Sequence, residues 1–396
     1  MKRSLFAVLA AALLLSSCVV YVPYEGEGGE PPSRPPREDT GYEREYGNYP
    51  SEMDTNGFYE YLSPYGVWVH FSPYGYVWIP RQVRHNWRPY THGRWAWTNY
   101  GWTWVSYYEW GWVPFHYGRW GWDGRLGWFW VPGNIWSPAW VSWRWSNLYI
   151  GWSPLPPDIE FVAGVGIGPL PDNFPDFYWV FVEGRYFQYD SIDRYALPYE
   201  RNRTIVRQTV HKANLTVRNR QLLNYGVDID QVGRLTRSQV SRYELEEGEK
   251  PGPSQVSGNS VRIFRPAVKK VEAAKPKVFI EKEEAEKQVP EIRAEELEKK
   301  GPPGEAERRL RDDQDQEMRL LEESQERDNT ELRKKSEDEE KLAESPVQKE
   351  KIRREAEVKS SEMKKEHAEE KAKITERHQE EEKVVKSRIR KKDKKD

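Results

Sequence analysis

Residues 92–105 read HGRWAWTNYGWTWV, and residues 116–131 repeat the pattern as HYGRWGWDGRLGWFWV. In each copy, two Trp-x-Trp pairs flank a short segment that contains Asn or Asp together with Gly. A spacing of two residues places both indole rings of a pair on one face of a β-strand. Asn, Asp and Gly favour the tight turn that joins two antiparallel strands. Each copy therefore predicts a β-hairpin.

The same signal extends beyond these two copies. Shorter echoes of the pattern precede them at 63–68 and 72–78, and a further Trp pair follows at 143 and 145. All of the 19 tryptophans except Trp179 lie between residues 58 and 157. Serial hairpins predict a mainly β, antiparallel hairpin-repeat module over 58–157, which is closed into a small barrel or packed as a sandwich.

Most of these indole rings are expected in the core. Burying one tryptophan contributes roughly 4–6 kcal/mol, so leaving many of them in water would remove a stability margin of only about 5–15 kcal/mol. A few aromatic rings near turns and strand ends remain as candidates for an exposed stripe that stacks on the C–H faces of sugars. These possible ligand-facing aromatics are Tyr100, Tyr107, Tyr108, Trp110 and Tyr117.

The histidines and arginines of the repeat are expected to serve the hairpins themselves. His92 and His116 occupy nearly equivalent places in the two copies, as do Arg94 and Arg119. No short His spacing of the metal-ligand type occurs, so we expect neither a metal nor a cofactor. The arginines are expected to stack on neighbouring indole faces. No catalytic signature is recognisable, so the chain is predicted to be non-enzymatic, with an envelope hydrolase as the less favoured alternative.

The N-terminus carries an export signal. Lys2 and Arg3 precede an apolar run from Leu5 to Leu15, which is shorter than the about 20 residues that span a membrane. The next residues, LSSC at 15–18, resemble the bacterial lipobox. That resemblance implies a signal peptide at 1–17, cleavage before Cys18 and lipidation of this cysteine. Several acyl chains give lasting membrane attachment.

Three further regions follow from composition. Residues 18–57 are rich in Gly and Pro and predict a flexible tether behind the lipidated cysteine. Residues 158–265 predict a small α+β unit with strand-like segments and a short helix capped by Asp228. The strand-like segments are 177–182, 204–206, 215–217, 241–245 and 261–264. The net charge of −2 indicates no nucleic-acid partner.

Residues 266–396 form a charged, low-complexity tail. No aromatic residue follows Phe279, and Glu alternates with Lys and Arg in a pattern that supports transient helix. The apolar positions keep no heptad, so a stable coiled coil is not expected. The tail is predicted to be disordered or a single helix that acts as a solvated spacer. The alternative is that its basic end docks on anionic envelope polymers or a protein partner.

Several motifs recur in an order typical of one family. They are HYGRW at 116–120, GWFWVPG at 127–133, WSPAWVSWR at 136–144 and GWSPLPP at 151–157. This stretch resembles the exported Trp/Tyr/Gly-rich bacterial proteins that are classed as a domain of unknown function. The resemblance covers about 58–157 and extends loosely to Tyr243. It implies export and residence in the cell envelope, and it brings no established activity or catalytic residue.

Together these features predict a cell-envelope lipoprotein that acts as a structural or interaction module. Val19 follows Cys18 in place of the Asp that retains lipoproteins at the inner membrane, which favours the outer membrane, facing the periplasm. Peptidoglycan or another envelope glycan is the expected ligand of the module. The alternative is a protein–protein scaffold that uses the charged tail to bind envelope proteins.

Overall fold

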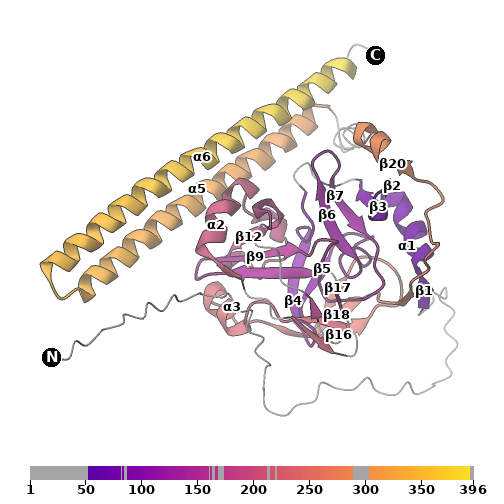
Figure 1. Ribbon diagram of the computed structural model, residues 1–396, viewed down its shortest axis with the longest axis horizontal. Helices are drawn as coiled ribbons and strands as arrows, with labels where there is room; N and C mark the ends of the chain where they lie inside the picture. The colour runs from indigo at the N-terminus through magenta and orange to yellow at the C-terminus, as the bar shows by residue number, and fades with distance from the viewer. Residues whose placement is uncertain are drawn as a thin grey trace, which may run out of the picture. The chain divides into compact units, whose positions relative to one another are not determined.

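The computed structural model describes residues 52–81, 83, 87–159, 161, 162, 166, 167, 174–211, 215–218, 221–288 and 303–392. This part of the chain contains many short strands, and two long helices lie at its C-terminal side (Figure 1). The predicted mainly β class with a helical tail is therefore confirmed. The predicted signal peptide, Cys18 and most of the predicted tether lie outside the described residues.

The Trp-rich stretch folds into the predicted antiparallel hairpins. They are β2 (Gly66–Phe71) with β3 (Gly75–Pro80), β4 (Gly93–Thr98) with β5 (Gly101–Ser106), β6 (Arg119–Asp123) with β7 (Gly127–Val131), and β8 (Val141–Trp145) with β9 (Tyr149–Pro154). Each hairpin places a tryptophan directly opposite another one. These cross-strand pairs are Trp68 with Trp78, Trp95 with Trp104, Trp120 with Trp130, and Trp143 with Trp152.

Glycine is required where the second hairpin turns. Gly101 begins β5 with φ +86°, a left-handed conformation that other residues adopt only at a cost. A Cβ atom on Gly101 would lie 2.2 Å from the carbonyl oxygen of Asn224, which belongs to the neighbouring strand β15 (Gln221–Asn224). The glycine therefore permits both the turn and the close approach of the next strand.

The hairpins do not continue into one closed sheet. The first and third share the five-stranded sheet β20-β2-β3-β7-β6, in which β20 is Ile280–Glu281. The second lies in the seven-stranded sheet β14-β15-β5-β4-β16-β18-β17, whose further strands are β14 (Leu215–Arg218), β16 (Arg242–Glu247), β18 (Ser260–Ile263) and β17 (Gln255–Ser257). The fourth lies in the four-stranded sheet β12-β9-β8-β13, with β12 (Val180–Glu183) and β13 (Val210–His211). The expected barrel closure is therefore wrong. Long connections such as 107–118 carry the chain to another sheet, and aromatic side chains from all three sheets share one core.

Most of the tryptophans lie in the core, as predicted. The 19 tryptophans divide into 16 that are buried, two that are partly buried (Trp97 and Trp145) and one, Trp122, that is 41% exposed. Several indole N–H groups donate to carbonyls of distant loops, as Trp78 does to Leu62 (3.0 Å) and Trp130 to Tyr117 (2.8 Å). The rings therefore fasten the loops as well as filling space.

The expected α+β unit at 158–265 does not stand apart from the hairpin module. Its strands β12 (Val180–Glu183), β13 (Val210–His211), β15 and β16 (Arg242–Glu247) pair with β9, β8, β5 and β4 respectively. The reason is that each hairpin leaves unpaired strand edges, which these later segments cover. The predicted helix is confirmed as α3 (Ile229–Thr236), and the Asp228 side chain accepts from the amides of Asp230 and Gln231.

Two strand predictions in this region need correction. The first two residues of 177–182 lie in the 3-10 helix η2 (Asp176–Tyr178), and β12 begins only at Val180. The segment 204–206 belongs to the helix α2 (Asn202–Gln208). Its β-branched residues favour a strand locally, but the helix buries Ile205 against Tyr149 and Phe181. Tertiary packing therefore outweighs the local preference.

The tether and the tail also contribute to the folded module. The strand β1 (Glu52–Asp54) pairs in parallel with β19 (Ala267–Lys269), and α1 (Thr55–Leu62) begins directly after β1, with its first amides capped by Asp54. Downstream, β20 (Ile280–Glu281) pairs with β2. The predicted boundary at 57 therefore falls inside α1, and the one at 266 falls in the short connection between β18 (Ser260–Ile263) and β19. Folded structure crosses both positions, because pairing with distant strands orders segments whose own composition is polar.

The rest of the tail forms two helices rather than a disordered segment or a single helix. The helices α5 (Pro303–Leu342) and α6 (Pro346–Lys392) lie side by side (Figure 1). Contacts from Gln314 to Glu381 and from Gln325 to Glu370 show that they are antiparallel. Leu321 and Ile374 are buried, but polar pairs dominate the described contacts between the helices, which is why no heptad is visible in the sequence.

The remaining elements are short. They are η1 (Ser63–Tyr65), β10 (Phe161–Val162), β11 (Gly166–Ile167), η2 (Asp176–Tyr178), η3 (Gly184–Tyr186), η4 (Ile192–Arg194), η5 (Tyr199–Arg201), β14 (Leu215–Arg218), β17 (Gln255–Ser257) and β18 (Ser260–Ile263).

Candidate functional site

The five aromatics predicted to face a ligand do not form one stripe. Trp110 and Tyr117 are buried in the core, at 4% and 1% exposure. Tyr100 is partly buried and packs edge-on against Trp136. Tyr108 stacks on Trp110, with 4.2 Å between the ring centroids. Only Tyr107, at 37%, is exposed. The prediction failed for the buried pair because nearness to a turn in the sequence does not determine which loop covers a ring.

Tyr107 instead binds the segment that carries a tyrosine cluster, which the sequence analysis missed. Its hydroxyl donates to the carbonyl of Asp190 (2.7 Å). On the same segment, Tyr186 stacks on Tyr195 with 4.3 Å between centroids, and Tyr189 packs edge-on against Tyr195 at 4.9 Å. Tyr189 is 46% exposed. We call Tyr107, Tyr186, Tyr189 and Tyr195 the tyrosine surface.

Charged side chains hold the tyrosine surface in place. The Asp190 carboxylate accepts from Arg94, which also donates to the hydroxyl of Tyr243 (3.0 Å). Partial burial raises the pKa of Tyr107, so its phenol stays protonated and keeps donating. The ring of Tyr107 is thereby fixed to both β4 and the segment that carries Tyr189, which makes this a preorganised surface.

The repeated arginines and histidines behave largely as expected. Arg119 lies over the ring of Trp140, 3.3 Å from its centroid, which confirms the stacking prediction for this copy. Arg94 lies 5.8 Å over Tyr243 instead of over an indole. His116 is buried and stacks on Trp136, whereas His92 packs against Tyr107 and Tyr108. Within the described part of the chain, no three potential ligands among His, Cys, Asp and Glu are grouped to hold a metal ion.

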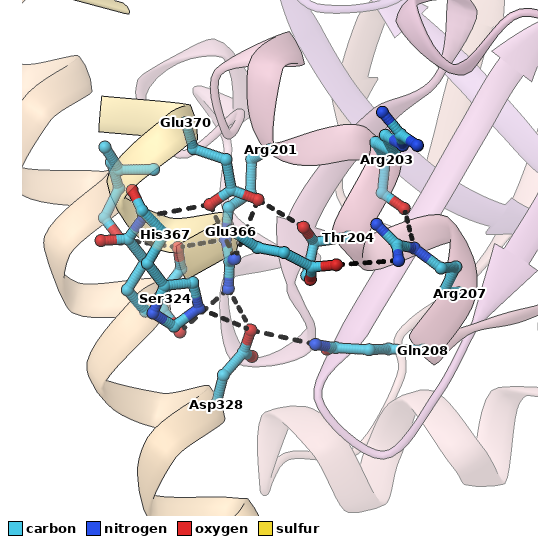
Figure 2. A network of polar contacts seen from close by, with 12 residues as sticks. Arg201, Arg203, Thr204, Arg207, Gln208, Ser324, Asp328, Glu366, His367 and Glu370 are labelled. Carbon is cyan, nitrogen blue, oxygen red and sulfur yellow. Dashed lines mark hydrogen bonds and ion pairs between the residues drawn. The ribbon is translucent and has the colours of Figure 1, made fainter. Parts of the chain in front are cut away.

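The most extensive polar cluster joins α5 and α6 to the β module (Figure 2). At its centre lies Arg201, whose guanidinium is fully buried. It pairs with Asp328 of α5 and with Glu370 of α6, the latter at 3.0 Å, and its Nε donates to Ser324 (3.0 Å). One side chain of the β module therefore binds both α5 and α6, which together we call the helical hairpin.

The helix α2 contributes a matching polar face. Thr204 donates to Glu370, and Gln208 donates to Asp328 at 3.0 Å. Arg201, Thr204 and Gln208 are spaced so that they share one side of the helical segment 199–208, as Figure 2 shows. The buried carboxylates are thus satisfied by several donors besides Arg201, which is the condition under which burying them is tolerated.

The charges of this cluster reinforce one another. Burial alone would raise the pKa of Asp328, but His367, the Arg201 guanidinium and the Tyr149 hydroxyl outweigh it and lower that pKa below its ordinary value. The same carboxylates raise the pKa of Arg201 against the effect of its burial. The ion pair therefore stays charged at neutral pH.

A second group of ion pairs lies beside the first. Arg377 of α6 binds Glu200 at 2.7 Å, Glu317 of α5 at 3.0 Å and Glu381 at 2.9 Å. Adjacent residues of the module, Glu200 and Arg201, thus have opposite charges, and each binds the opposite charge on the hairpin. This alternation fixes the position of the helices along the module.

Sequence reasoning missed this docking site, although one local signal was present. Ser345-Pro346-Val347-Gln348 forms a capping box, in which the Ser345 hydroxyl accepts from the Gln348 amide and the Gln348 side chain accepts from the Ser345 amide. Together with proline at the first helical position, this motif marks the start of a new helix in the middle of the tail.

A family of unknown function (DUF6600) matches residues 59–159. The matched range contains the four hairpins and agrees with the resemblance over about 58–157, whereas the looser extension to Tyr243 lies outside it. No curated protein and no solved structure matches the chain. The match includes Arg94 and Tyr107 but neither the segment of Tyr189 nor the residues that dock the hairpin.

None of the helices in the described part of the chain has both the length and the apolar character needed to cross a membrane.

Proposed function

We propose that this chain is a non-enzymatic lipoprotein of the bacterial cell envelope whose β module binds an envelope glycan, such as peptidoglycan, at the tyrosine surface. The proposal depends on the exposed rings of Tyr107 and Tyr189. Tyr107 is held in place by its hydrogen bond to Asp190, and Tyr189 by its ring contact with Tyr195. Flat aromatic rings of this kind stack on the C–H faces of sugars.

The distribution of the other aromatics supports the tyrosine surface over an indole platform. Because 16 of the tryptophans are buried, they hold the sheets together and are not accessible to a polymer. Tyrosine rings also carry hydroxyls that can hydrogen-bond sugar hydroxyls at the edge of the stack. The acid–base groups that gather around Arg201 are paired with one another at the hairpin, which favours a structural role for them over catalysis.

The glycan proposal is tested by sedimentation with purified peptidoglycan sacculi. The chain from residue 19 onward is used whole, because β19, β20 and the long helices complete the module. We expect it to sediment with the sacculi. In the Tyr107→Ala/Tyr189→Ala variant, the loss of two aromatic stacks at about 0.5–1.5 kcal/mol each weakens binding about tenfold.

The matched control is Tyr74→Ala, which removes an exposed tyrosine from the β2–β3 turn, outside the tyrosine surface. We expect it to bind within about twofold of the parent chain, since one peripheral contact contributes little. Circular dichroism of the variants checks that they remain folded. A parent chain that stays in the supernatant, or equal binding of all three proteins, contradicts the proposal.

Membrane attachment through Cys18 has a separate test. The lipobox resemblance at 15–18 implies acylation of this residue, which is the single cysteine of the chain. Palmitate labelling of the protein in its host is expected and should disappear in Cys18→Ala. Fractionation of the labelled protein on a density gradient then tests the outer membrane as its location. Label that persists in Cys18→Ala rules out this anchor.

A scaffold function is the second candidate, supported by the end of the helical hairpin. Leu342 and Val347 flank the connection between α5 and α6 and are 83% and 79% exposed. Because contiguous exposed apolar surface marks protein contacts, the scaffold proposal takes these two side chains as the centre of such a patch. A photo-crosslinking residue at position 347 should then capture a specific envelope protein, whereas one at the exposed Glu362 should not.

A further inference from the structure

A groove with arginines on its walls opens beside the tyrosine surface, at the C-terminal end of α3. Its volume is about 490 Å³, and its lining includes Arg234, Arg237 and Arg242, with Asp230 as the one acidic side chain. Ser238 and Gln239 add polar groups to the lining. We call this the arginine groove. Its lining carries three positive charges against one negative charge.

The positive charges of the arginine groove are not neutralised by the described part of the chain. All three arginines are exposed, and none of them forms an ion pair with a described residue. Arg234 donates to the neutral side chain of Gln231 at 2.7 Å. Elsewhere in the molecule, arginines such as Arg201 and Arg377 each bind several carboxylates. The groove therefore offers guanidinium donors that are available to a ligand.

The backbone at Arg237 points to a role for its side chain. Arg237 caps α3 with φ +53°, a left-handed conformation. Glycine is the residue that adopts this conformation without strain, whereas other residues adopt it at a cost. The helix end would thus be more stable with glycine. The arginine adds charge to the groove at the expense of local stability.

Two contacts connect the arginine groove to the tyrosine surface. Gln188, next to Tyr189, donates to Thr236 at 2.7 Å and to Ser238 at 3.0 Å, and Ser238 lines the groove. On the other side, Arg94 pairs with Asp190 and donates to Tyr243, the neighbour of the groove residue Arg242. A polymer stacked on Tyr189 therefore passes within reach of the groove.

We infer that the arginine groove binds an oxyanion, either a carboxylate or a phosphate, carried by the glycan that stacks on the tyrosine surface. This inference rests on the proposed glycan function and narrows its ligand class to anionic glycans. Guanidinium groups form paired hydrogen bonds with both oxyanions, and a charged acceptor strengthens these bonds. The tyrosines then supply stacking and the arginines supply selection by charge.

The test compares a charged glycan with its neutral ester and adds a phosphate polymer as a second anion. Binding of the chain from residue 19 onward is measured with polygalacturonate, with its fully methyl-esterified form, and with a glycerol phosphate polymer. We expect at least one of the charged polymers to bind about tenfold more tightly than the neutral ester, with a preference that declines as salt rises. The tighter of the two charged polymers identifies the oxyanion.

Two triple variants assign the preference to the groove. Arg234→Gln/Arg237→Gly/Arg242→Gln should bind the charged and neutral polymers equally, and glycine at 237 keeps the helix end unstrained. Arg333→Gln/Lys334→Gln/Lys335→Gln changes the net charge by the same amount on exposed positions of α5 and should keep the preference.

The outcomes separate this inference from the proposed function. Loss of the preference in the groove variant alone supports the inference. If the parent chain binds the charged and neutral polymers equally, or if both triple variants lose the preference, the inference is overturned while glycan binding stands. If neither these polymers nor sacculi bind, both the inference and the proposed function are overturned.

Discussion

Arg201 shows how a single residue can determine the attachment of two helices. Its guanidinium and the Asp328 carboxylate are both fully buried, so neither group can turn to water if its partner is lost. Glu370 shares the same guanidinium from the other helix. In such a cluster each charge interacts strongly with the others. The net contribution of the cluster to stability depends on every member being present.

Removing the positive charge of Arg201 is therefore expected to destabilise the folded protein strongly. In Arg201→Met, two carboxylates stay buried without their cation, which should lower the free energy of unfolding by about 3–5 kcal/mol. The control is Arg207→Met, because Arg207 pairs with Glu366 where the side chains are 54% and 33% exposed. Arg207→Met should lower the free energy of unfolding by no more than about 1 kcal/mol. Urea denaturation followed by circular dichroism measures both, and equal losses would refute the assigned roles.

A buried histidine predicts how stability depends on pH. Burial of His116 lowers its pKa to about 4, whereas an unfolded chain has a histidine pKa of about 6.5. Between these values the unfolded state binds a proton that the folded state does not. Stability is therefore greatest above pH 6.5 and falls as the pH decreases towards 4, by up to about 3 kcal/mol.

The free energy of unfolding measured from pH 7.5 to 4.5 checks this dependence. His116→Phe keeps an aromatic ring beside Trp136 and should flatten the curve in this window, although its stability at pH 7.5 is lower. Val210→Ala, at a side chain that is 54% exposed, changes no titratable group and should keep the slope of the parent. Parallel curves for the parent and His116→Phe would be evidence against the assignment.

At the scale of elements, the hairpins combine two uses of tryptophan. Facing rings such as Trp120 and Trp130 fill the space between sheets, and indole N–H groups bind loop carbonyls. Trp95 is equally buried, yet its N–H has no partner among the described residues. The two positions therefore differ in hydrogen bonding while they share size and burial.

Replacing each ring by phenylalanine separates these two contributions. Trp130→Phe and Trp95→Phe remove a similar volume, but only Trp130→Phe leaves the buried carbonyl of Tyr117 without its donor. We expect Trp130→Phe to be more destabilising than Trp95→Phe by about 1–3 kcal/mol. Chemical denaturation of the two variants gives the difference. A larger loss in Trp95→Phe would show that packing, and not the hydrogen bond, dominates.

At the scale of the whole molecule, the helical hairpin is held firmly over only part of its length. Residues 316–328 of α5 and 366–377 of α6 carry ion pairs and hydrogen bonds to the module. Those of α5 include a hydrogen bond from Gln316 to the carbonyl of Arg194 and an ion pair of Arg327 with Glu183 at 2.7 Å. The connection between the helices exposes Leu342 and Val347 instead. Local stability should therefore decrease towards that end.

Hydrogen exchange measured by mass spectrometry tests this gradient. Amides in 316–328 and 366–377 should exchange more slowly than those in 336–358. Arg201→Met should raise exchange in both docked segments while the strands β2 to β9 stay protected, because those strands have their own aromatic core. Uniform exchange along α5 and α6 would mean that the docking contacts do not stabilise the helices.

Local features of the sequence were enough to determine the hairpins, the burial of most indole rings and the cap of α3. Each depends on residues close together in the chain: Trp-x-Trp spacing, turn residues such as those at 98–101, and Asp228 ahead of two free helix amides. The helix restart at Ser345 was equally local, and the capping box there is a signal that could have been used.

Only the tertiary structure decided which hairpins share a sheet, which tyrosines are exposed and where the charged helices dock. Arg201 and Asp328 are 127 residues apart, and nothing in the composition around either one distinguishes it from other charged residues. Burial selects such partners. A buried charge without a partner has a high cost in free energy, so only a matched pair of opposite charges is stable there. The tyrosine surface likewise depends on a segment from 186–195 folding back onto β4 and β5, and no periodic pattern in the sequence encodes that approach.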